Sequence, residues 1–341
     1  MKKIFSTLIV CVVLVSVATA QDPNFSQFYA SPLTLNPALT GKFDGVYRVA
    51  GNYRNQWPSI NNAFTTSTIS FDMGILKSRI PENDQFGIGI MGFTDRAGNG
   101  ALVNNYVGLS VAYHKSLDPD GYHQLGAGFQ GSYTNKRLDV ASLKFGDQLR
   151  ANGFTGLSQE NFASFDPSLS YFDMNAGILY NGTTNGSNNY YAGVSMYHLN
   201  RHKEVFSDTG FYNLATRTTF QAGGKIPVGT YNAVHFAANY SLQAKAQNTM
   251  IGAAFSLNVN NDEENPVNMY LGAWTRFNNV NDAIIPYMGI EFGGIHIGAT
   301  YDVNTSSLKS ASNSKGGIEI SLIYTKKYVD PNMRKLNCPK F

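Results

Sequence analysis

The sequence has few cysteines, few charged residues and, after its first twenty residues, no long apolar run. Its two cysteines are Cys11 and Cys338, and Cys11 lies in an N-terminal segment that we expect to be removed, so the mature chain can form no intramolecular disulfide. Charged residues make up only 14% of the 341 residues. Removal of Lys2 and Lys3 with that segment leaves 24 Lys and Arg against 23 Asp and Glu, and this near balance gives no indication of a nucleic-acid partner. The rest of the chain has no segment that approaches a transmembrane helix.

The N-terminal segment has the order of a secretory signal peptide. Two lysines, an apolar run over residues 4–17 and small residues ending at Ala20 precede Gln21. We therefore expect cleavage between Ala20 and Gln21. A retained anchor is the alternative, but the run is shorter than the roughly 20 residues that a spanning helix needs. A lipoprotein would use Cys11, but the preceding residue, Val10, is not the small residue that is expected there.

From residue 46 onward the chain repeatedly alternates between apolar and polar or small residues, a period of two that predicts strands with two different faces. In residues 103–115 the apolar set is Val103, Val107, Leu109, Val111 and Tyr113, and the other set is Asn104, Tyr106, Gly108, Ser110 and His114. Residues 46–54, 233–243 and 295–303 alternate in the same way.

About fourteen such windows occur. They are residues 46–56, 63–74, 85–94, 103–115, 122–134, 171–180, 189–198, 215–226, 232–243, 248–258, 267–277, 284–292, 294–304 and 316–325. Two are weaker than the rest, because residues 86–93 are apolar on both faces and Pro286 removes a ladder hydrogen bond from another. With its 13% aromatic residues, the chain is all-β, either a large soluble domain or a membrane barrel.

The lengths of the connections favour the barrel. The long connections, at residues 135–170, 199–214 and 304–315, are the fifth, seventh and thirteenth, whereas the even-numbered ones include tight turns such as 117–121 and 293–294. Long loops on one side and short turns on the other are typical of bacterial outer-membrane barrels with both termini periplasmic. Closure is also required physically, because an open sheet edge in hydrocarbon would leave backbone groups unpaired. We therefore predict a transmembrane antiparallel β-barrel of about 14 strands.

The residues that carry chemistry form no recognisable catalytic or metal-binding motif. Three of the six histidines, His114, His235 and His296, fall on the polar sets, but no two histidines on one element have the spacing of metal ligands and no serine nucleophile accompanies them. We therefore expect no enzyme, no cofactor and no metal. The polar sets also contain the basic residues Arg48, Arg54, Arg217, Lys225 and Arg276, which either select a solute or pair with interior acids.

Two motifs near the start of the chain resemble those of a known family. The run QDPNFSQFYASPLTLNPALTG at residues 21–41 and NYRNQWP at residues 52–58, with CPKF at residues 338–341, are similar to the PorP/SprF family of Bacteroidetes outer-membrane proteins. The resemblance covers essentially the whole mature chain. It implies a role in type IX secretion, with partners among the secretion machinery, and in gliding bacteria a link to gliding motility through the export and attachment of adhesins.

The domain organisation that follows is a signal peptide at residues 1–20, an N-terminal strap or plug at 21–45, the barrel at 46–325 and a basic tail at 326–341. The strap presents aromatic contact area and a turn, through Phe25, Phe28, Tyr29, Asn36 and Pro37. We expect it on the periplasmic side, where it would fold into the lumen, lie against a periplasmic partner or pack on the barrel rim.

Two further surfaces are candidates for partner contacts. The tail would dock a periplasmic component of the machinery through Tyr328, Arg334, Lys335, Cys338 and Pro339. The long connections would contact the secreted substrate on the outside through Phe154, Phe162, Phe165, Phe206, Phe211 and Tyr212. The leading prediction is a non-enzymatic protein that is embedded in outer-membrane lipid and holds an adhesin-like substrate. The alternative is a porin or hydrophobic-solute channel. An outer-membrane hydrolase would rest on the histidines alone.

Overall fold

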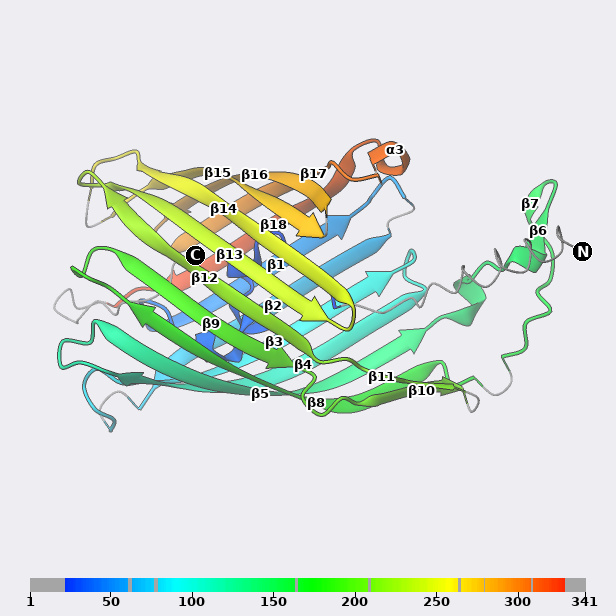
Figure 1. Ribbon diagram of the computed structural model, residues 1–341, viewed down its shortest axis with the longest axis horizontal. Coiled ribbons are helices and arrows are strands. Elements are labelled where there is room, and N and C mark those ends of the chain that lie inside the picture. Colours follow the sequence, from blue (N-terminus) through cyan, green and yellow to red (C-terminus); the bar gives the residue numbers. More distant parts are fainter. Residues whose placement is uncertain are drawn as a thin grey trace, which may run out of the picture.

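The computed structural model describes residues 22–60, 63–76, 79–162, 165–207, 210–262, 265–278, 280–307 and 309–328. They form a closed antiparallel barrel with extensions at one end, and a short N-terminal segment lies inside the barrel (Figure 1). No helix in these ranges is long and apolar enough to cross a membrane.

Fourteen strands close the barrel in sequence order, because the last strand pairs with the first. They are β1 (Tyr47–Gln56), β2 (Phe64–Ile75), β3 (Gln85–Ala97), β4 (Leu102–Ser116), β5 (His123–Leu138), β8 (Ser168–Gly182), β9 (Asn189–Tyr197), β12 (Arg217–Val228), β13 (Asn232–Gln243), β14 (Ala246–Asn258), β15 (Asn268–Asn278), β16 (Val280–Phe292), β17 (Ile295–Asn304) and β18 (Lys315–Lys326). Each of the fourteen predicted windows coincides with one of these strands, so the predicted fold class is confirmed.

The alternation in the sequence separates the two faces of the wall. On β4, Ser110 and His114 are buried in the lumen, whereas Val107 and Leu109 are 54% and 64% exposed on the outer face. The segment that is apolar on both faces has a reason in the structure. Met91 and Phe93 on β3 point inward and are buried, and Phe93 stacks on Tyr106 with ring centroids 4.6 Å apart.

Pro286 weakens the wall locally, as its chemistry predicts. The ladder between β16 and β17 runs through Ile284 opposite Val303 and resumes at Tyr287 opposite Thr300. Pro286 still opposes Ala273 on the other side of β16. The irregularity therefore affects one ladder and leaves the closed barrel intact.

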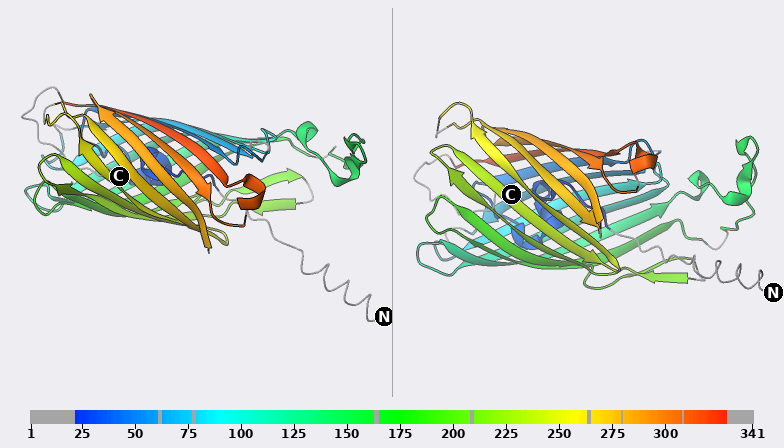
Figure 2. Two further views of the ribbon diagram at one scale, coloured as in Figure 1. Left: turned by 90° about the horizontal axis from the view of Figure 1, so that it is seen from above. Right: turned by 45° about the horizontal axis from the view of Figure 1, so that its top comes forward.

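The long connections all leave the barrel at one end, here called the long-connection rim (Figure 2). Residues 139–162 form an arm with η3 (Val140–Ser142), η4 (Gly146–Gln148), β6 (Leu149–Arg150) and β7 (Gly153–Phe154). The connection after β9 forms a hairpin of β10 (Lys203–Ser207) and β11 (Gly210–Asn213), and α3 (Lys309–Ser312) precedes β18. The opposite end, with turns such as 229–231 and 293–294, is the short-connection rim.

The N-terminal segment runs through the lumen from one rim to the other. It contains η1 (Phe28–Ala30), α2 (Pro32–Leu35) and η2 (Pro37–Leu39), each of about one turn. Asp22 contacts His198 and Gln243 at the long-connection rim, whereas the Val46 N–H donates to the Lys326 carbonyl at the short-connection rim, 2.7 Å away. We call residues 22–45 the plug.

Candidate functional site

The plug begins in a cluster of charges at the long-connection rim. His198, just after β9, lies between two carboxylates, with Nε2 2.8 Å from Asp22 Oδ2 and Nδ1 2.6 Å from Asp173 Oδ2. Arg217 Nη1 is 3.4 Å from Asp22 Oδ2, and the Asp22 N–H donates to Gln243 Oε1 at 2.7 Å. We call these five residues the latch.

The charged side chains of the latch stabilise one another. Burial alone would lower the pKa of His198, but the charge of Asp22 and hydrogen bonds to Asp173 and Asp22 raise it to about 9. Burial would raise the pKa of Asp22, but the charges of His198 and Arg217 hold it well below its ordinary value. The start of the plug is therefore held by an imidazolium between two carboxylates.

The next plug residues bind a network of buried charges. Arg54 is within 2.7 Å of Asp302 and 2.9 Å of Glu319, and both acids are fully buried. The Ser26 N–H donates to Glu319 Oε2 at 2.7 Å, and Ser26 Oγ donates to Asp302 Oδ1 at 2.8 Å. Arg276 also reaches Asp302, at 2.7 Å. The sequence left two roles open for the interior basic residues, solute selection and pairing with interior acids. The structure shows pairing with acids for Arg48, Arg54, Arg217 and Arg276.

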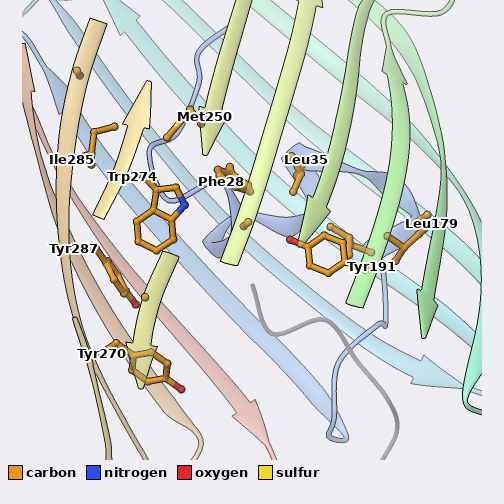
Figure 3. Close-up of a cluster of buried hydrophobic side chains, with 14 residues drawn as sticks. Phe28, Leu35, Leu179, Tyr191, Met250, Tyr270, Trp274, Ile285 and Tyr287 are labelled. Atoms are coloured by element: carbon orange, nitrogen blue, oxygen red, sulfur yellow. The ribbon is translucent and has the colours of Figure 1, made fainter. Parts of the chain in front are cut away.

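Apolar packing follows along the plug. Phe28 is buried in a cluster with Trp274, Ile285 and Tyr287 of the β15–β16 wall (Figure 3). The Tyr29 ring packs against this cluster, with centroids 5.3 Å from Trp274 and 6.0 Å from Tyr287. Burial of these aromatic side chains is a major stabilising contribution, roughly 1.5–3 kcal/mol for each large apolar side chain. This part of the lumen is thus a packed core.

In the middle of the plug, wall side chains satisfy backbone carbonyls. The Leu33 carbonyl accepts from Tyr197 OH at 2.8 Å and from Gln130 Nε2 at 3.2 Å. The Leu35 carbonyl accepts from Ser195 Oγ at 2.7 Å, and Arg217 Nη2 donates to the Thr34 carbonyl at 3.0 Å. Because a single-turn helix leaves most of its carbonyls unpaired, these donors make its burial possible.

Glycines in the wall allow the plug to approach. A Cβ at Gly177 would lie 1.9 Å from Asn36 Oδ1, and one at Gly128 would lie 2.4 Å from the Ala38 nitrogen. A Cβ at Gly87 would lie 2.3 Å from the Thr40 carbonyl oxygen. The close contact between wall and plug therefore requires glycine at these strand positions.

The plug leaves the lumen through a further ion pair. Arg48 binds Asp72 with Nε and Nη2, at 3.0 and 2.7 Å, and its Nη2 also donates to the Leu39 carbonyl at 3.1 Å. The Gly41 N–H donates to the same carboxylate at 2.7 Å. The ion pair therefore holds the backbone of the plug at two points, the Leu39 carbonyl and the Gly41 N–H, where the plug leaves the lumen.

The structure places the predicted strap residues inside the barrel. Phe25, Phe28, Asn36 and Pro37 are buried, and Asn36 begins η2 by accepting from the Ala38 N–H at 2.8 Å. The segment that we expected on the periplasmic side therefore fills the lumen, the first of the three arrangements left open. Because Asp22 and Lys326 lie at opposite rims and the termini themselves are outside the described residues, the expectation that both termini are periplasmic stays a prediction.

The other candidate residues are distributed as follows. Phe154 is 49% exposed on the arm, whereas Phe162 and Phe165 are partly buried where the arm joins the barrel. The backbones of Phe206, Phe211 and Tyr212 lie in the β10–β11 hairpin, and their side chains are outside the described ones. Ala20, Gln21, Arg334, Lys335, Cys338 and Pro339 lie outside the described residues, and Tyr328 is the last residue within them.

The histidines are distributed over several separate contacts. His235 Nε2 is 3.2 Å from Ser256 Oγ, and His296 Nε2 is 2.7 Å from Tyr287 OH. His202 stacks on Tyr171, with ring centroids 4.3 Å apart. Within the described ranges, no group of three or more histidine, cysteine or acidic residues is placed to hold a metal ion.

The latch and the lumen-facing glycines were not among the predicted site residues. His198 forms no motif with its neighbours in the sequence, since its partner Asp22 is 176 residues away. The glycines did carry a signal, because Gly87, Gly128 and Gly177 interrupt predicted strands on the lumen-facing set. Strand glycines on an inward face indicate a close backbone approach, and this pattern could have predicted that something fills the lumen.

A closed barrel with an apolar outer face and a lumen packed by its own N-terminal segment defines a bacterial outer-membrane β-barrel protein. The family model described as type IX secretion system membrane protein PorP/SprF matches residues 17–324. The chain belongs to this family and is an outer-membrane component of type IX secretion, which implies that it interacts with the secretion machinery.

Solved structures with a similar fold are outer-membrane barrels of low sequence identity. The monoaromatic hydrocarbon channel CymD has a TM-score of 0.50 and 11% identity, over 88% of this chain and 93% of that one. The toluene transporter TbuX of Ralstonia pickettii has a TM-score of 0.47 and 12% identity, over 88% and 94% of the two chains. A FadL homologue of Pseudomonas aeruginosa has a TM-score of 0.47 and 10% identity, over 85% and 92%. These likenesses concern the fold alone. No curated protein matches the sequence significantly.

Proposed function

We propose that this barrel is a non-enzymatic holder of a secreted, adhesin-like substrate at the cell surface. The substrate contacts the long-connection rim, which faces outward, and the short-connection rim and the tail contact the periplasmic machinery. The observation that carries this proposal is the plug, which occupies the lumen that a solute channel would need.

The position of the exposed apolar side chains supports the long-connection rim as the substrate contact. On the arm, Leu149, Phe154 and Leu157 are 57%, 49% and 94% exposed. The arm extends away from the barrel wall (Figure 1). Apolar side chains that extend into solvent, away from membrane and core, tend to mark protein contacts.

The rim is also well anchored. Glu204 of β10 is 2.6 Å from Lys136 Nζ and accepts from Tyr171 OH at 3.1 Å. These contacts tie the β10–β11 hairpin to β5 and β8. A hairpin that is fixed at its base can present a partner surface without a large loss of conformational entropy on binding.

Conductance in planar bilayers tests the proposal. The full mature chain is expected to show no stable conductance, whereas deletion of residues 22–43 is expected to open a pore, because a barrel of this strand number without a plug encloses an aqueous lumen. Both proteins must first show heat-modifiable gel mobility as evidence of a folded barrel. Steady conductance or hydrophobic-solute flux through the intact chain would favour the channel alternative.

Loss of substrate display is the second measurement. Replacement of the arm residues 144–158 by a short Gly-Ser linker should release the secreted substrate from the cell surface without changing the amount of barrel in the outer membrane. Normal display by this variant would contradict the proposed substrate contact.

A further inference from the structure

Two arginines lie on the outer face of the barrel at the long-connection rim, on either side of β4. Arg96 of β3 and Arg137 of β5 are each directly opposite Val103 of β4, one on either side. All three residues therefore point to the same face, and the two arginines are two strand spacings, about 10 Å, apart. Both arginines are exposed.

The arginines lie where the outer face changes from apolar to polar. Along β5, Tyr133 is 48% exposed and packs on Phe172 of β8, with ring centroids 5.2 Å apart. Two residues further along, Asn135 Nδ2 donates to the hydroxyls of Ser168 and Ser170, at 3.1 and 2.9 Å. A face that changes in this way has reached the headgroup level of the bilayer.

A cavity of about 530 Å³ adjoins Arg137 where the arm begins. Six apolar residues line it, among them Leu138, Phe162 and Phe165, and Arg137 and Asp139 supply its charges. Phe162 packs on Phe165, with ring centroids 5.8 Å apart. The cavity is within the range of ligand-binding pockets, ~300–1,000 Å³.

Two carboxylates flank Arg137: Asp139 follows it along the chain, and Asp166 accepts from the N–H of Ser168, which is opposite Arg137 on β8. The Asp139 carboxylate accepts from Ser142 Oγ at 2.7 Å and from the Ala141 N–H at 3.2 Å, so it serves to close the η3 turn. Guanidinium groups bind phosphate oxygens through paired N–H donors.

We propose that Arg96, Arg137 and the adjoining cavity form a binding site for an anionic lipid of the surrounding leaflet. The two guanidinium groups bind the lipid phosphate, and the apolar lining receives part of an acyl chain. The two exposed arginines at headgroup level on the outer face and the adjoining apolar cavity together favour a lipid over a protein segment. The lining of this site lies outside residues 144–158, whose replacement tests substrate holding, so the two proposals can fail separately.

Native mass spectrometry of the full mature chain tests the site. The protein is transferred from neutral detergent into nanodiscs of phosphatidylcholine with a minor fraction of either phosphatidylglycerol or lipid A, and retained lipids are counted. We expect preferential retention of one anionic lipid. The double variant R96Q/R137Q should lower that retention roughly tenfold or more, since each charged hydrogen-bonding group contributes appreciably to affinity. Val140→Asn, which puts a polar side chain of similar size into the lining, should also lower it.

A matched control is available on the same sheet. Lys115 of β4 lies on the outer face near the short-connection rim and pairs with Asp84 at 3.2 Å, so Lys115→Gln should leave retention unchanged. All variants are compared only after heat-modifiable mobility shows a folded barrel.

Three results would overturn the proposal. Equal retention by wild type and R96Q/R137Q would remove the role of the arginines. Displacement of the lipid by millimolar inorganic phosphate would identify a simple anion site. If R96Q/R137Q and Val140→Asn keep the lipid but lose a co-isolated secreted protein, the cavity binds a protein segment instead.

Discussion

Asp22 and His198 are 176 residues apart in the sequence, and the imidazole Nε2 lies 2.8 Å from the carboxylate Oδ2. This single contact joins the start of the plug to the connection that carries the β10–β11 hairpin. It also makes the attachment of the plug dependent on the protonation of one side chain.

Stability should fall at alkaline pH. Because the pKa of His198 is raised from 6.5 to about 9 in the folded protein, its contribution is fully present below pH 6.5 and is lost as the pH rises through about 9. A shift of this size corresponds to roughly 3 kcal/mol. The test is to measure, at pH values between 6 and 10, the temperature at which the folded barrel changes to the gel mobility of the unfolded chain.

His198→Gln is the control for this pH dependence. It should start with a lower transition temperature and show little further loss up to pH 9. A wild-type profile that is flat over this range would contradict the role of the imidazolium. On the acid side, the lowered pKa of Asp22 predicts loss of its contribution as the pH falls below 3.8.

Gly128→Val should displace the plug. A Cβ at this position would come within 2.4 Å of the backbone at Pro37 and Ala38, which cannot move without disturbing the whole segment. We expect the barrel to assemble but to conduct in planar bilayers. Gly131→Val on the same strand is the control, since nothing lies within 4 Å of its Cβ. Equal, negligible conductance of both variants would show that the plug tolerates the change.

Arg54→Leu should destabilise the folded barrel by roughly 3–5 kcal/mol, because it leaves the buried Glu319 and part of the Asp302 charge uncompensated. The double variant R54L/E319L should recover part of this loss. Lys115→Gln, which removes the exposed partner of Asp84 while this buried carboxylate keeps its hydrogen bonds from Tyr113 OH and the Ser116 N–H, should cost less than about 1 kcal/mol. Urea unfolding in detergent measures all three, and an Arg54→Leu effect no larger than that of Lys115→Gln would refute the importance of the network.

Cysteine labelling should place the start of the plug on the same side as the arm. In a Cys338→Ser background, Asn24→Cys and Leu157→Cys should react with a membrane-impermeant maleimide on intact cells, whereas Asn185→Cys in a short connection should react only after permeabilisation. Reaction of Asn24→Cys together with Asn185→Cys would contradict the passage of the plug through the lumen. Inverted labelling of all three would instead invert the orientation of the barrel.

Truncation after Val329 tests the tail. The prediction from its basic residues is that the barrel still assembles with heat-modifiable mobility, while surface display of the substrate and recovery of periplasmic partners both fail. A truncated chain that never reaches the outer membrane would identify the tail as an assembly element. Normal display would show that the tail is not a docking segment.

The strands and their faces were determined by the sequence alone. The alternation of apolar and polar residues is a local property of each strand. It therefore predicted both the strands of the wall and which of their faces is apolar. The parity of the connection lengths then indicated a barrel, because sequential antiparallel strands send alternate connections to opposite rims. Even the exception over residues 86–93 was visible, although its cause, the inward packing of Met91 and Phe93, was not.

The tertiary structure alone decided what fills the barrel. Residues 22–45 have no strong periodicity, and each of their single turns is too short to be stable by itself. They are held by wall groups from distant parts of the chain, such as Ser321, which donates to Gln27 across 294 residues at 2.7 Å. Only closure of the barrel brings these partners to one place, so the position of the plug depends on contacts that no local pattern in the sequence records.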